Sequence, residues 1–167
     1  MSANKPVKEL TFTRVLDAPR DMVFRAWTDP AHLARWWGPN GFTNPICELD
    51  VRPGGAIRID MLGPDGRYFL MSGEYREIVP PERLVFTINA VKNERGEPEL
   101  VNINTVTFEP VAGKTRLSFL TQVLKAGPGS EEFMAGMEEG WSQTLDKMAA
   151  EVEKYRPNPC TIPRGSQ

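Results

Sequence analysis

The sequence has little of what metal sites and disulfide frameworks require. Its 167 residues include two cysteines and a single histidine, His32. One histidine excludes every metal site that needs two imidazoles. Cys47 and Cys160 are far apart, and Cys160 lies in a proline-rich tail, so no disulfide framework is expected. We predict that the protein depends on no metal and on no organic cofactor.

Charge of one sign and long apolar runs are also missing. The 20 Lys and Arg residues face 22 Asp and Glu, a formal net charge of −2, which offers no attraction to a phosphate backbone. No apolar run approaches the ~18 residues of a membrane span, and the N-terminal residues contain no signal-peptide core. We therefore expect a cytoplasmic, soluble protein that has no membrane span and binds no nucleic acid.

Sequence motifs of catalysis are absent as well. No G-x-S-x-G, Walker loop, dinucleotide fingerprint or C-x-x-C occurs in the chain. Any catalysis would have to come from groups that no motif reveals. The sequence therefore favours a protein without catalytic activity, although it does not decide whether the protein is an enzyme.

The sequence is rich in proline, and its 15 prolines mostly separate segments with a clear periodicity. Residues 10–16 alternate between apolar and polar, which is typical of a half-buried strand. We expect a helix to begin at Pro19, and a second helix, capped by Asp29, to end before Gly38 and Pro39. Six further strands are expected over residues 46–51, 57–61, 68–79, 84–88, 101–109 and 115–124.

A long final helix is expected over residues 130–155. Its apolar residues recur every three or four positions and form one stripe: Phe133, Met137, Trp141, Leu145, Met148 and Val152. The order of elements predicts an α+β fold, in which a curved seven-stranded antiparallel sheet packs against the long C-terminal helix, with two short helices after the first strand. We expect one domain over residues 8–155 and an irregular, proline-rich tail over residues 156–167.

Several short motifs, together with this order of elements, resemble one known family. They are the segments 17–19, 26–30, 36–39, 47–55 and 78–84, and Gly140, Trp141 and Leu145 in the final helix. The chain is similar, from about Leu10 to Tyr155, to the branch of the SRPBCC superfamily named after the activator of heat-shock-protein-90 ATPase. The additional N-terminal domain of the eukaryotic activators is not expected here, because the first strand is expected near Val7.

The resemblance implies the helix-grip fold of START lipid-transfer domains and birch-pollen allergens. In these folds the long helix and the curved sheet enclose an apolar cavity. The residues of this chain that we predict to line such a cavity and bind a ligand are Trp36, Trp37, Phe42, Ile59, Met61, Met71, Phe86, Phe119, Met137 and Trp141.

The function that we expect is the binding of a small apolar or amphipathic molecule between the sheet and the C-terminal helix. The first alternative is a protein-interaction or co-chaperone module, with a chaperone or another protein as its partner. The second alternative is a cyclase-like or hydrolase-like enzyme that uses the same cavity. The sequence allows a monomer or a homodimer.

Some residues admit both a structural and a functional interpretation. Trp36 and Trp37 either pack at a helix end or line the mouth of the cavity. Arg14, on the apolar face of the first strand, either anchors an acidic ligand group or keeps its head in water. Gly136 and Gly140 either let the helix approach the sheet or leave space for a ligand. We also expect the cavity to open beside Trp37, Gly38 and Phe42, with residues 38–44 as its movable rim.

Polar side chains outside the expected cavity favour structural roles. Glu48 and Asp50 share one face of a strand, as an acid–base pair would, but cross-strand pairing with Arg58 and Asp60 is the commoner arrangement. We expect His32 to lie at the surface and Cys47 to be an inert, buried thiol.

Overall fold

The computed structural model describes residues 7–92, 95 and 97–154, and the tail predicted over residues 156–167, with Cys160, lies outside them. The elements follow one another as β1 (Lys8–Leu16), α1 (Arg20–Thr28), α2 (Pro30–Trp36), β2 (Thr43–Leu49), β3 (Ala56–Leu62), β4 (Tyr68–Val79), β5 (Arg83–Lys92), β6 (Pro98–Val111), β7 (Lys114–Ala126) and α3 (Glu131–Lys154).

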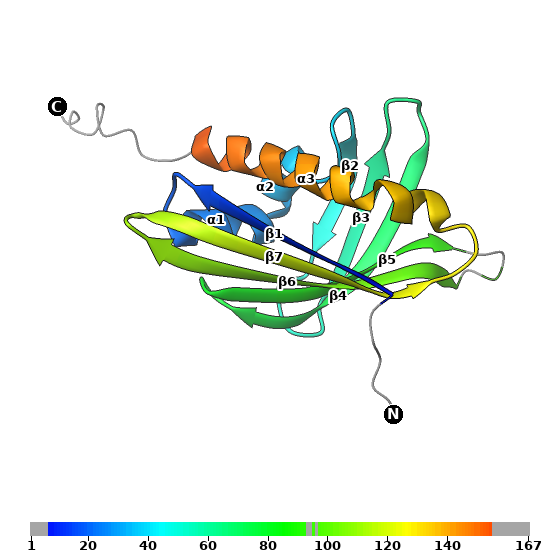
Figure 1. Ribbon diagram of the computed structural model, residues 1–167, viewed down its shortest axis with the longest axis horizontal. Coiled ribbons are helices and arrows are strands. Elements are labelled where there is room, and N and C mark those ends of the chain that lie inside the picture. Colours follow the sequence, from blue (N-terminus) through cyan, green and yellow to red (C-terminus); the bar gives the residue numbers. More distant parts are fainter. Residues whose placement is uncertain (1–6, 93–94, 96, 155–167) are drawn as a thin grey trace.

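The seven strands form one antiparallel sheet in the order β1-β7-β6-β5-β4-β3-β2. Consecutive strands from β2 to β7 are neighbours, and β1 pairs with β7. Figure 1 shows the sheet curving beneath α3, which runs along its open side, while α1 and α2 lie at one end of the molecule. The predicted α+β order and the helix-grip arrangement are therefore confirmed.

Local signals in the sequence explain where the short helices begin. Asp29 caps α2, and its carboxylate accepts a hydrogen bond from the backbone nitrogen of Ala31 at 2.9 Å, as predicted. The sequence indicated Pro19 as the first helical position of α1; in the structure Pro19 is the cap residue and the helix begins one residue later, at Arg20. Trp36 and Trp37 lie at the end of α2, just before the loop that leads to β2.

The two halves of α3 differ in how firmly they are held. In its second half Leu145, Met148 and Val152 are at most 2% exposed. In its first half Met137 alone among the described residues is buried. The first half of α3 therefore covers the sheet without filling the space beneath it.

Polar contacts reinforce the same end of the helix. The Arg14 guanidinium, on the inner face of β1, donates to a carboxylate oxygen of Asp146 at 3.0 Å and to the Ser142 hydroxyl at 3.2 Å. Both partners lie on α3, so Arg14 joins the edge of the sheet to the helix. This contact gives Arg14 a structural role in place of the ligand anchor considered above.

We expect Leu145→Ala to lower the free energy of unfolding by about 2–5 kcal/mol, because it empties a fully buried site between α3 and the sheet. Urea unfolding followed by circular dichroism measures the change. Glu138→Ala, at an exposed position of the same helix, should change it by about 0.5 kcal/mol or less. Equal effects of the two substitutions would contradict this account of how α3 is held.

Candidate ligand-binding cavity

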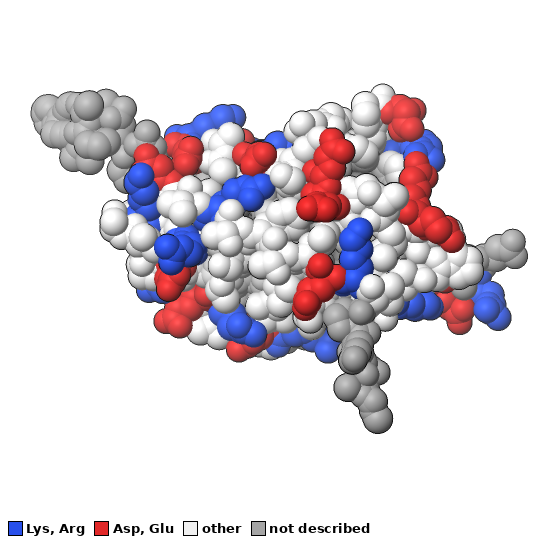
Figure 2. Space-filling model, in the orientation of Figure 1, with Lys and Arg blue, Asp and Glu red and all other residues white. Residues whose placement is uncertain are grey.

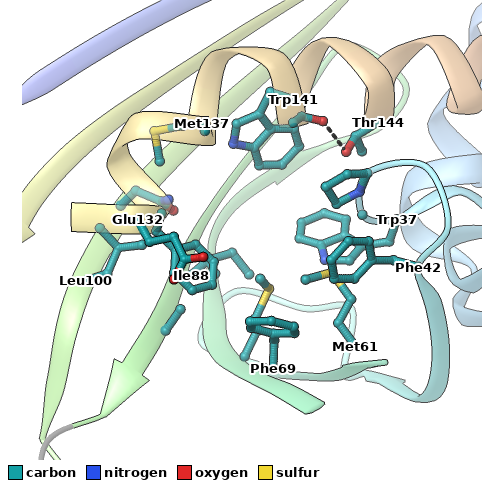
Figure 3. A pocket seen from close by; sticks show the side chains of 18 of the residues that line it. Trp37, Phe42, Met61, Phe69, Ile88, Leu100, Glu132, Met137, Trp141 and Thr144 are labelled. Atoms are coloured by element: carbon teal, nitrogen blue, oxygen red, sulfur yellow. Dashed lines mark hydrogen bonds between the residues drawn. The ribbon is translucent and has the colours of Figure 1, made fainter. Parts of the chain in front are cut away.

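A cavity of about 280 Å³ lies between the first half of α3 and the inner face of the sheet. Its volume is close to the lower end of the ~300–1,000 Å³ range of small-molecule sites. Figure 3 shows Trp141 and Met137 on α3 above the space, Phe69 below it, and Trp37 and Phe42 at one side. Its apolar lining consists of Trp37, Pro39, Phe42, Met61, Phe69, Met71, Ile88, Ala90, Leu100, Phe133, Met137 and Trp141.

Aromatic rings in contact with one another form much of the wall. The ring centroids of Trp37 and Trp141 are 5.4 Å apart and their planes meet at 86°. Phe69 contacts two further rings, with centroid distances of 5.7 Å to Phe42 and 5.9 Å to Phe133. These separations are typical of favourable aromatic pairs, so the rings hold one another in place and still offer faces to a ligand.

Two glycines of α3 leave room at the cavity. A Cβ atom on Gly136 would meet no atom within 4 Å, and one on Gly140 would meet Pro39 at 3.5 Å. Both glycines line the cavity. Of the two interpretations given above, the structure supports the one in which the missing side chains leave space.

The end of the cavity near Trp37 is closed by hydrogen bonds to α3. The Lys147 ammonium donates to the carbonyl oxygens of Gly38 and Pro39, at 3.1 and 3.2 Å, and burial lowers the pKa of Lys147. The backbone nitrogen of Asn40 donates to the Gln143 side chain at 3.1 Å. These contacts attach residues 38–40, the first part of the segment expected to be a movable rim, to α3.

The lining residues that are most exposed lie elsewhere. They are Arg67, in the turn between β3 and β4, and Glu132 and Gly136 on the first turns of α3. The Arg67 guanidinium lies 5.1 Å from the centroid of the Phe69 ring and pairs with Asp65 at 3.0 Å. The cavity therefore opens between the first turns of α3 and the β3–β4 turn, and both signs of charge are present at its mouth.

Two neutral polar side chains lie inside this wall. Thr144 is 3% exposed, and its hydroxyl donates to the carbonyl oxygen of Gly140 at 2.7 Å (Figure 3). Asn102, on β6, is 4% exposed, and its oxygen accepts a hydrogen bond from the side-chain nitrogen of Asn104 at 3.1 Å.

The structure brings some of the predicted cavity residues together and separates others from them. Trp37, Phe42, Met61, Met71, Met137 and Trp141 line the cavity. Trp36, Ile59, Phe86 and Phe119 lie in the adjoining core, all at most 4% exposed. The two neighbouring tryptophans thus face different surroundings, since the Trp36 indole nitrogen donates to the carbonyl oxygen of Ala26 at 3.1 Å.

Sequence reasoning did not single out several lining residues. Among them are Phe69, Phe133, Leu100 and Asn102. The alternation along β6 could have indicated Leu100 and Asn102 because both fall on its inner face. Phe133 lay in the predicted apolar stripe of the final helix, but the stripe alone does not show where packing ends and open space begins.

The carboxylates near β2 make their contacts away from the cavity, and among them Asp60 is buried whereas Glu48 and Asp50 are exposed. Asp60 pairs with Arg58 at 3.0 Å, and Asp50 with Arg52 at 2.9 Å, while Glu48 is exposed and stands opposite Arg58 in the sheet register. His32, which is half-buried, also lies away from the cavity lining. In the described part of the chain, no group of three or more His, Cys, Asp or Glu side chains could hold a metal ion.

The family model described as activator of Hsp90 ATPase homolog 1-like protein (AHSA1) matches residues 17–153. The chain belongs to the AHSA1 family. Among curated proteins the comparison finds no match. The family assignment confirms the resemblance stated from the sequence motifs.

Solved structures share the fold of this AHSA1-family chain. A crystal structure from Chromobacterium violaceum is 32% identical, with 90% of this chain and 98% of that chain covered and a TM-score of 0.71. A solution structure from Arthrobacter aurescens is 27% identical over 87% and 86% of the two chains, with a TM-score of 0.74. The AHSA1 protein of Silicibacter pomeroyi is 26% identical over 87% and 98%, with a TM-score of 0.72.

The surface of the AHSA1 domain carries mixed charge. On the face shown in Figure 2, the described Lys and Arg side chains are interspersed with Asp and Glu. None of the described helices is long and apolar enough to span a membrane.

We expect Cys47 to be alkylated slowly in the folded protein. Burial, together with the negative charges of Asp29 and Glu48, raises the pKa of this thiol from 9.0 to about 11. At pH 8 the thiolate fraction is then about 100-fold smaller than that of an unperturbed thiol. The rate of reaction with iodoacetamide, measured by mass spectrometry in a Cys160→Ser background, should be lower by about that factor.

The same shift predicts a pH dependence of stability. Because the folded state holds the Cys47 proton more tightly, this group favours folding below pH 9 and loses its contribution as the pH rises towards 11. Comparison of urea unfolding with that of Cys47→Ala isolates this change. An alkylation rate equal to that of a small thiol peptide would overturn both expectations.

Proposed function

We propose that this protein binds a small, mainly apolar or amphipathic molecule in the cavity beneath the first half of α3. The observation that carries the proposal is the cavity of about 280 Å³ whose lining is mostly aromatic and aliphatic. Protein interiors are normally close-packed, so unfilled apolar space forgoes dispersion contacts that a ligand would restore. The membership of the AHSA1 family, whose fold commonly encloses a cavity, supports the same function.

The wall is suited to hold a flat or elongated apolar body. The rings of Trp37 and Trp141 contact each other, as do those of Phe42 and Phe69, and rigid side chains lose little conformational freedom when a ligand binds. Met61, Met71 and Met137 add flexible thioether side chains that fit irregular shapes. Binding would draw mainly on the hydrophobic effect, at roughly 25 cal/mol per Å² of apolar surface removed from water.

The mouth accounts for the amphipathic part of the proposal. Arg67 and Glu132 are exposed and border the same opening. A polar substituent of the ligand could stay in contact with water and with these two charges while the apolar body lies inside.

The lining favours binding over catalysis. Among its described residues, Glu132 is the one carboxylate, and no histidine or cysteine borders the cavity. Acid–base chemistry on an enclosed substrate generally needs a titratable group close to the reacting atoms. Glu132 stands at the exposed mouth.

The experiment that tests the proposal is a titration with N-phenyl-1-naphthylamine, a neutral dye that becomes fluorescent in apolar surroundings. We expect saturable binding to the folded protein. Gly136→Trp should reduce the affinity at least about tenfold, because a Cβ at this position meets open space and the indole can occupy the mouth. The measurement is made well below the unfolding temperature of each variant.

A matched variant controls for the effect of a new tryptophan on α3. Ala135 is the exposed neighbour of Gly136 and does not line the cavity, so Ala135→Trp should bind the dye as the wild type does. Equal losses in both variants, or no saturable binding to the wild type, would sink the proposal. In the second case, stimulation of the ATPase of a purified chaperone would favour the interaction-module alternative.

A further inference from the structure

Of the two neutral polar side chains in the cavity wall, Asn102 is the one whose hydrogen-bond donors have no acceptor among the described residues. The Asn102 side chain is 4% exposed and borders the cavity together with Leu100 from the same strand face and Ile88 from β5. A buried amide carries both a donor and an acceptor group, and both need partners away from water. The hydrogen bonds that Asn102 forms within the protein therefore influence which ligands the cavity can bind.

Asn104 satisfies the acceptor half of the Asn102 amide. The Asn104 side-chain nitrogen lies 3.1 Å from Asn102 Oδ1 and 3.5 Å from the carbonyl oxygen of Phe86. Because the Phe86 carbonyl can only accept, the end of the Asn104 amide that faces it is assigned as the nitrogen, and this nitrogen in turn requires the oxygen of Asn102 opposite it. Asn104 is fully buried, so it acts as a positioning residue for Asn102.

No described residue accepts a hydrogen bond from the donor half of the Asn102 amide, because the hydrogen bond that this side chain makes uses Oδ1. Nδ2 is also not among the fully buried unpaired atoms, so it is not completely enclosed by protein. Since Asn102 borders the cavity, the space into which Nδ2 can donate is the cavity itself.

We infer that Asn102 selects ligands that carry a hydrogen-bond acceptor, and that the ligand class is a flat apolar molecule with a carbonyl group at its inner end. This inference rests on the proposed function and specifies the chemistry of the same cavity. A carbonyl oxygen accepts the Nδ2 hydrogen and brings no hydrogen of its own. A hydroxyl group would introduce a second donor that needs an acceptor in apolar surroundings.

Asn102 is selective because a ligand without an acceptor would bind with a less favourable free energy. A site with a buried donor discriminates against a ligand that lacks the acceptor because the donor is then left unpaired. Thr144 does not compete for this role, since its hydroxyl already donates to Gly140 within α3.

The test compares two ligands of the same shape, 2-acetylnaphthalene and 2-isopropenylnaphthalene, in which a CH2 group replaces the carbonyl oxygen. Both are measured by displacement of N-phenyl-1-naphthylamine from the wild type, from Asn102→Leu and from Thr144→Val. Since the two compounds differ in hydrophobicity, the quantity compared is the ratio of their dissociation constants in each protein. Asn102→Leu keeps the branched shape of the side chain, at a larger volume that affects both compounds alike, and removes the donor.

We expect the preference for the ketone to fall about tenfold in Asn102→Leu and to stay unchanged in Thr144→Val. A ratio that is the same in Asn102→Leu as in the wild type, with both compounds bound, overturns the inference and leaves the proposed function intact. Dye binding without displacement by the ketone does the same. Failure of the dye to bind at all overturns the proposed function and this inference with it.

A second measurement uses the wild type alone and so does not depend on whether the variants fold. The side-chain amide resonance of Asn102 in a 15N-labelled sample should move on saturation with 2-acetylnaphthalene, in the direction of a stronger hydrogen bond, and much less with 2-isopropenylnaphthalene. Equal shifts with the two compounds would contradict a hydrogen bond from Asn102 to the carbonyl oxygen.

Discussion

The packing of the second half of α3 against the sheet is the constraint on which the rest of the structure depends. A curved antiparallel sheet leaves its inner apolar face open unless another element covers it. Leu145, Met148 and Val152 close one part of that face completely, and Arg14 joins the edge strand to the same part of the helix. Because this half carries the attachment, the first half of α3 is free to border a cavity.

Most of the fold could be predicted from the sequence because its signals are local. Prolines, glycines and the Asp29 cap mark where elements begin and end, and alternation identifies the strands. The site could be predicted only in part. Trp37 and Trp36 are adjacent and chemically identical, yet one borders the cavity and the other is sealed in the core. That difference depends on how three separate elements meet, which no local pattern records.

Asn102 shows a different limit of sequence reasoning. An asparagine within a strand is easily taken for a surface residue, because asparagine is mostly exposed in proteins. Its neighbours on the same face, Leu100 and Asn104, are both buried, and the second of these is another polar residue at an inward position. Polar residues at positions that the strand period assigns to the interior are therefore the places where a site is best sought.

The contrast between the two ends of α3 has a consequence for the range of molecules that the cavity can accommodate. Lys147 and the buried residues near it hold one end of the helix to the loop after α2. Gly136 and Gly140, which weaken helix rigidity, lie in the other half, directly over the cavity. The roof of the cavity therefore contains two residues of low helix propensity, while the floor is built from paired strands. If the proposed function holds, such a site would accept ligands of different sizes and select them by the group that they present to its floor.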